Sequence, residues 1–174
     1  MSGENKIMNV FLSFTVIIIS VILAVILVRK ESIHFNQLNE CITMVKETGD
    51  RAFQQKESFN EILKSFYISA KYTSIDIPVS YINNINDGMT SPEAWETAVL
   101  QSDIKLYQWE KDVLKHFGNN LFFCQSDKIK EYTDNAVSQL SEFRDNAKEK
   151  KIKTIKTNAV CTVSAGLMIA LLIL

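Results

Sequence analysis

The sequence predicts an all-α protein in which a helical domain is held between two membrane-spanning helices. Two uncharged apolar stretches, 7–28 and 157–174, bracket a polar segment, 29–156. At about 1.5 Å per residue the stretches reach ~33 Å and ~27 Å, against a hydrocarbon layer of ~30 Å. Both stretches can span the hydrocarbon layer, although the second is close to the minimum length that this requires. Within the polar segment, apolar residues recur at helical spacing and no Asn-Gly hairpin signal occurs.

The N-terminal element is predicted as one helix over 4–48, because no proline or glycine interrupts this range. Gly49 follows it and suits a helix end. The part beyond the first apolar stretch carries apolar residues on one face, namely Leu38, Cys41, Ile42 and Val45. This helix would therefore run from the membrane into the domain without a break.

The middle of the chain predicts several shorter helices. A helix over 59–70 has core-facing spacing, and a run around Tyr81 stops at Gly88. Ser91 is predicted to cap the next helix, whose inner face comprises Ala94, Trp95, Ala98 and Val99. Gly118 follows two basic residues, so we expect it in the left-handed position after a helix end.

The C-terminal element is predicted as one helix of ~70 Å over 127–174. Its apolar positions step by three or four residues, as Ile129, Tyr132, Ala136, Leu140, Phe143 and Ala147. Both terminal helices would then be rigid stalks that transmit a displacement of the domain to the membrane.

The basic residues predict which side of the membrane the domain occupies. Seven of them flank the apolar stretches on the domain side, namely Arg29, Lys30, Lys148, Lys150, Lys151, Lys153 and Lys156. The positive-inside rule therefore predicts a cytoplasmic domain on a cell-membrane protein with two spans. A cleaved signal peptide is the alternative. The first apolar run is longer than a signal core, and no small-x-small cleavage site precedes Arg29.

Small residues predict how the two membrane helices pair. Ser20 and Ala24 lie four apart on the first, and Thr162, Gly166 and Ala170 lie four apart on the second. Such stripes let helix backbones approach closely. Their depths agree, so we expect antiparallel packing with Ser20 against Gly166 and Ala24 against Thr162.

Composition and motifs argue against catalysis and against nucleic-acid binding. Between 31 and 147 there are 18 acidic and 11 basic residues, which makes a poor nucleic-acid surface, while the basic stems suit anionic membrane lipids.

The three cysteines have no CxxC spacing, and no Walker-type loop occurs. His34 and His116 lie far apart, outside any metal-ligand motif, and suit surface or capping roles. We therefore predict no enzyme, no cofactor and no metal.

Large apolar residues of the domain are predicted to lie mainly in its core. Trp95 and Trp109 could each anchor a core or an interface, and the core is favoured. The apolar run 122–124 is also expected there.

Four segments of the chain resemble the stage III sporulation protein AB family. They are SPEAWETAV (91–99), LYQWEKDVLKHFGNNL (106–121), QSDKIKEY (125–132) and the apolar end AGLMIALLIL (165–174). The most specific positions are Ala94 with Trp95, then Phe117, Gly118 and Leu121, and then Ser126 with Asp127; Trp109 lies in the second segment. The chain departs from the family pattern at Phe122, where a glycine is expected, and at Lys130 or Glu131, where a glutamine is expected.

The resemblance implies a function that the residues alone do not give. Members of this family belong to the complex that connects mother cell and forespore in endospore formation. They are similar to F-type platform proteins of type II secretion and type IV pilus systems. The implied role is a non-enzymatic membrane platform subunit on the mother-cell side, coupling the companion stage III AA secretion-type ATPase to the other subunits. Homo-oligomerisation stays open.

A second hypothesis is a two-helix membrane sensor with an extracytoplasmic helical ligand-binding domain. It requires the opposite topology and a cytoplasmic signalling domain, whereas the sequence ends at Leu174. A membrane-bound hydrolase is a third class, but no nucleophile and base can be assigned.

Overall fold

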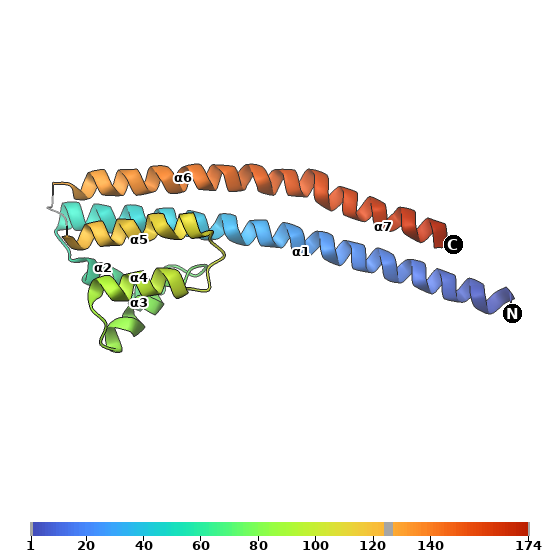
Figure 1. The fold of residues 1–174 in the computed structure, drawn as a ribbon, viewed down its shortest axis with the longest axis horizontal. Helices are drawn as coiled ribbons and strands as arrows, with labels where there is room; N and C mark the ends of the chain where they lie inside the picture. The colour runs from blue at the N-terminus through green and yellow to red at the C-terminus, as the bar shows by residue number, and fades with distance from the viewer. Residues whose placement is uncertain (1, 124–126, 174) are drawn as a thin grey trace. The chain divides into compact units, whose positions relative to one another are not determined.

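The computed structural model describes residues 2–123 and 127–173, and this part of the chain contains helices and no strand (Figure 1). The predicted all-α class is therefore confirmed. The helices are α1 (Ser2–Asp50), α2 (Phe59–Ser69), α3 (Ile77–Asn86), α4 (Ser91–Gln101), α5 (Gln108–Phe123), α6 (Ile129–Lys153) and α7 (Val160–Ile173), with π-helical turns η1 (Arg51–Gln55) and η2 (Thr154–Ala159).

The chain forms two compact units. One comprises 33–146, and the other comprises 1–32 together with 147–174. Helices α1 and α6 each contribute to both.

The unit of the two chain ends contains the apolar residues of α1. One helix among the described residues is long and apolar enough to cross a membrane, and its apolar window lies near the N-terminus. Side chains such as Phe11 and Phe14 are exposed there, as a lipid-facing surface requires. The C-terminal segment is helical as predicted, but η2 interrupts the α-helical bonding between α6 and α7. Its crossing of the membrane stays a prediction.

The 33–146 unit packs its short helices in sequence order. α2 contacts α3, α3 contacts α4, and α4 contacts α5. The largest fully buried side chains of this unit include Trp95, Tyr81, Leu38, Met44, Ile62, Leu63, Ile77, Leu114 and Leu140. These positions follow the helical apolar spacing, so burial of one face per helix explains the core.

Two helices of this unit begin with reciprocal caps. Before α2, the Ser58 hydroxyl accepts from the Glu61 N–H, and the Glu61 carboxylate accepts from the Ser58 N–H at 3.0 Å. Before α4, the Glu93 carboxylate accepts from the Thr90 N–H at 3.1 Å. The predicted cap at Ser91 is therefore wrong by one residue, because Thr90 has the glutamate three positions later that a capping box needs.

Gly88 follows a helix end as predicted, whereas Gly49 and Gly118 lie inside helices. Gly88 has φ of 91° and follows α3, as expected of a left-handed helix end. Gly118 lies inside α5, so its predicted capping role is wrong. Gly49 lies one residue before the end of α1, and the helical path continues through η1 to Lys56, whose φ is 58°.

Gly49 lies at a point where two helices approach closely. A Cβ on Gly49 would lie 2.7 Å from the Thr133 Cβ of α6, well inside van der Waals contact. The absent side chain therefore allows α1 and α6 to pack closely at this point.

Candidate interaction surface

A buried polar pair joins α1 to the start of α5. Nε2 of His34 lies 2.9 Å from Oε2 and 3.1 Å from Oε1 of Glu110, so the ring donates to the carboxylate. His34 is 6% exposed and Glu110 is 2% exposed. Buried charged groups are rare unless they are paired, so this contact stabilises the junction of the two helices.

Glu110 also caps α5. Its Oε2 accepts from the Tyr107 N–H at 2.7 Å, three residues earlier, which is the spacing at which a glutamate at N3 reaches the N-cap backbone in a capping box. That spacing is the signal by which the sequence could have identified Glu110. The other ring nitrogen of His34, Nδ1, is buried without a hydrogen-bond partner.

This pair has no third metal-ligating side chain beside it among the residues that the structure describes. No group of three His, Cys, Asp or Glu residues that could hold a metal occurs in the part of the chain that the structure describes. Cys41 is buried on α1, and burial raises the pKa of its thiol well above the ordinary value. A thiol that stays protonated is a poor nucleophile. We therefore interpret the His34–Glu110 pair as a structural contact that holds α1 against α5.

The side chains of Tyr107 and Trp109 extend from the His34–Glu110 pair to the surface. The Tyr107 ring meets His34 edge-on at 5.0 Å between centroids, and it stacks on Trp109 at 4.6 Å with an angle of 11°. Tyr107 is 40% exposed and Trp109 is 55% exposed. The predicted core position of Trp109 is therefore wrong, because the inner face of α5 is occupied by Glu110, Leu114 and Phe117.

An open groove of about 650 Å³ runs between α5 and α6. Aromatic, amide and acidic side chains line it, which suits contact with another macromolecule better than enclosure of a small ligand. The lining residues are Trp109, Asp112, Val113, His116, Phe117, Asn120, Tyr132, Asn135, Ala136, Gln139 and Phe143.

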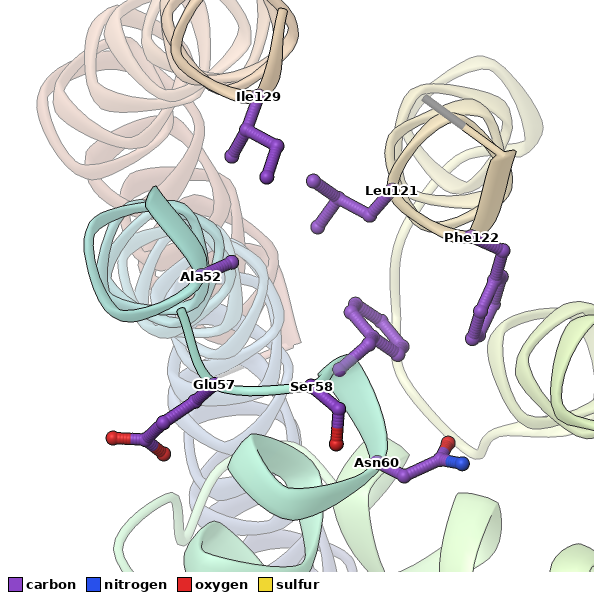
Figure 2. A pocket seen from close by; sticks show the side chains of 8 residues that line it. Ala52, Glu57, Ser58, Asn60, Leu121, Phe122 and Ile129 are labelled. Atoms are coloured by element: carbon purple, nitrogen blue, oxygen red, sulfur yellow. The ribbon is translucent and has the colours of Figure 1, made fainter. Parts of the chain in front are cut away.

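A smaller pocket of about 250 Å³ lies where η1, α2, α5 and α6 meet. Figure 2 shows Ala52, Leu121 and Ile129 around a common space, with Glu57, Ser58 and Asn60 along its rim. Phe122 meets Phe59 edge-on at 4.7 Å, so it belongs partly to the core. Phe123, however, is 79% exposed, which contradicts the predicted core position. Cys124 lies outside the described residues.

The family-motif residues of α4 and α5 come together in the core. Ala94, Trp95, Phe117 and Gly118 are all buried. Nε1 of Trp95 donates to the Leu114 carbonyl at 3.0 Å, and a Cβ on Gly118 would collide with the indole. Asp127 is exposed, whereas Ser126 lies outside the described residues.

The small residues of the membrane helices also meet, within the unit of the chain ends. A Cβ on Gly166 would lie 2.5 Å from the Cβ of Ser20. Ala24 and Gly166 are buried, and Ser20 and Thr162 are half-buried. The side chain of Ala170 lies outside those that the structure describes.

Comparison with known proteins gives one family. The model of stage III sporulation protein AB matches residues 9–174, nearly the whole chain, so the resemblance of the sequence motifs is confirmed. No curated protein and no solved structure matches the chain. The buried motif at Trp95 and Gly118, the apolar N-terminal helix and this match together show that the chain belongs to the stage III sporulation protein AB family.

Proposed function

We propose that this chain is a non-enzymatic membrane platform subunit of the channel complex between mother cell and forespore. Its helical domain would couple the companion stage III AA secretion-type ATPase to the other membrane subunits. The observation that carries the proposal is the family match over residues 9–174, and this membership indicates a role in stage III of sporulation. The long α1, which includes both an apolar segment and part of the helical domain, supports a mechanical link.

The proposed placement is in the mother-cell membrane with two spans and the domain in the cytoplasm. The seven basic residues on the domain side of the apolar stretches support this orientation. A membrane-impermeant thiol reagent tests it on intact cells, using chains without the native cysteines and with one new cysteine at Ser2 or at the exposed Met89. Labelling of Met89→Cys without labelling of Ser2→Cys would overturn the cytoplasmic placement.

Within the domain, we assign the contact with the ATPase to the groove between α5 and α6. The groove is larger than the pocket beside Ala52, and its aromatic lining resembles the residues that dominate protein interfaces. Gln139 lines the groove from an exposed position on α6, and the neighbouring Ser138 is exposed but does not line it.

The experiment uses the full-length chain in lipid nanodiscs and the purified ATPase. We expect the wild-type chain to retain the ATPase on an affinity resin, Gln139→Trp to lose it by filling the groove, and Ser138→Trp to keep it. Wild-type chain that retains no ATPase, with or without ATP, would contradict the coupling role. Equal retention by the two tryptophan variants would contradict only the assignment to the groove.

A further inference from the structure

We propose that the groove between α5 and α6 binds an arginine side chain of its protein partner, whose guanidinium stacks on the Trp109 indole and pairs with the Asp112 carboxylate. The inference rests on the proposed contact with the ATPase, and it names the chemical group that this contact recognises. Trp109 and Asp112 both line the groove. They lie three residues apart on α5, so they are neighbours on one face of the helix.

The Trp109 indole is held in place at the groove by its neighbours. It stacks on the Tyr107 ring at 4.6 Å between centroids, and Tyr107 in turn meets the buried His34 edge-on. The indole is nevertheless more than half exposed. The stack with Tyr107 occupies one face of the indole, so the second face is the one that can take a cation.

Asp112 supplies the negative charge that such a cation would meet. Of the described residues that line the groove, it is the only Asp, Glu, Lys or Arg. Gln108 orients the half-buried carboxylate, because its Nε2 donates to Oδ1 of Asp112 at 3.1 Å. Within the described part of the chain, this carboxylate has no ion-pair partner. It is therefore available for a charge-assisted hydrogen bond from another protein.

The two lysines of α5 are paired with α4 and not with Asp112. Nζ of Lys111 donates to two carbonyls at the C-terminal end of α4, at 3.1 Å and 3.2 Å. Lys115 forms an ion pair with Glu96. The segment 31–147 also carries 18 acidic against 11 basic residues. The overall charge of the domain and the unpaired carboxylate in the groove both favour a cationic group on the partner.

Arginine fits these groups better than lysine does. A guanidinium is planar, so it can stack on an indole while its N–H donors point outward from the stack. Asn120, Asn135 and Gln139 also line the groove, and their amide oxygens can accept from such donors. A lysine ammonium is compact and strongly hydrated, and it has no flat face to place on Trp109.

The test titrates the purified ATPase onto the full-length chain in lipid nanodiscs and measures the Kd. Asp112→Asn removes the charge and keeps the size of the side chain, whereas Trp109→Leu removes the aromatic face and keeps an apolar side chain. Each variant should raise the Kd about tenfold, which is the effect expected for loss of a charged hydrogen bond or of a stacked cation. Asp103→Asn is the matched control, because Asp103 is exposed and does not line the groove. It should leave the Kd unchanged.

Charge reversal identifies the group on the partner. Asp112→Arg should abolish binding of the wild-type ATPase, because it places a like charge where the guanidinium binds. Single arginines and single lysines of the ATPase are then changed to glutamate, and each variant is titrated against the Asp112→Arg chain. We expect reversal of one arginine to restore binding. Restoration by a lysine reversal alone, or by no reversal, would overturn the assignment to arginine.

The same titrations separate this inference from the proposed function. A wild-type chain that binds no ATPase, with or without ATP, would overturn the coupling role and the arginine contact together. Binding that Gln139→Trp abolishes, but that Asp112→Asn and Trp109→Leu leave unchanged, would overturn the arginine contact alone.

Discussion

The indole of Trp95 occupies the space that a side chain at Gly118 would take. The two residues belong to α4 and α5, and the missing Cβ lets the Trp95 Nε1–H reach the Leu114 carbonyl of the neighbouring helix at 3.0 Å. Glycine inside a helix costs about 1 kcal/mol relative to alanine. The close packing of a fully buried tryptophan offsets that cost, which explains a glycine within α5.

Gly118→Ala should therefore destabilise the protein, although alanine favours helix. The added methyl must displace the Trp95 indole, and overpacking of this kind costs about 1–3 kcal/mol. Denaturant unfolding of the full-length chain in detergent, followed by circular dichroism, measures the change.

A double-mutant cycle with Trp95→Phe provides the control, because the smaller phenyl ring leaves room for part of the methyl group of the alanine. We expect the cost of Gly118→Ala to be smaller in the Trp95→Phe background. A stabilising Gly118→Ala in the wild-type background would contradict the packing explanation.

The His34–Glu110 pair should be needed for stability. Glu110→Leu removes the acceptor of both the His34 ring and the Tyr107 N–H, and leaving a buried donor without its partner costs about 1–3 kcal/mol. Glu110→Gln keeps an acceptor oxygen and should cost less. Thermal melts of the full-length chain compare the variants.

The exposed pair of Lys105 and Asp103 offers a matched comparison, with Nζ and Oδ1 2.8 Å apart. Asp103→Asn should leave the melting temperature unchanged, because solvent screens surface ion pairs. A melting temperature of Glu110→Leu equal to that of the wild type would show that the buried pair contributes nothing.

The capping glutamates should make stability depend on acid pH. The Ser58 N–H and hydroxyl hold the pKa of Glu61 below its ordinary 4.5, and the Thr90 hydroxyl and N–H hold the pKa of Glu93 below the same value. Because the folded-state pKa is the lower one, each carboxylate stabilises the fold above about pH 4.5. That contribution is lost as the pH falls through the folded-state value.

Glu61→Gln and Glu93→Gln should thus lower the melting temperature near neutral pH and have less effect near about pH 3. The measured quantity is the difference between wild type and variant at each pH, because other carboxylates titrate in both proteins. A difference that is the same at both pH values would exclude the carboxylate charge as its cause.

The contact of Ser20 with Gly166 should allow a disulfide between the two membrane helices. In a background without native cysteines, Ser20→Cys with Gly166→Cys should form an intramolecular bridge on mild oxidation in membranes. A Cβ at position 166 would lie 2.5 Å from the Ser20 Cβ, which is shorter than the ~3.8 Å between the Cβ atoms of a disulfide, so the helices must part slightly.

Ser20→Cys with Leu171→Cys is the control, because the Leu171 side chain is exposed. Non-reducing gels at low expression distinguish an intramolecular bridge from a dimer. A yield no higher than that of the control would mean that the two small-residue stripes face something other than each other.

The sequence by itself determined the helical class, the apolar N-terminal helix and the inner faces of several helices. The α4 face of Ala94, Trp95, Ala98 and Val99 is buried as its spacing predicts. These features depend on local periodicity and on continuous hydropathy, which a single chain displays directly. The family likewise follows from local motifs, and the comparison confirms it.

Only the tertiary structure decided which residues meet across helices. It showed Gly118 as a packing site for Trp95, Trp109 as a surface residue, and Glu110 as the partner of His34. The periodicity of α5 leaves these roles open, because the burial of each face depends on which neighbouring helix covers it. A glycine that follows a helix end and a glycine packed under an indole look alike in sequence, because the difference lies in a contact with a residue 23 positions away.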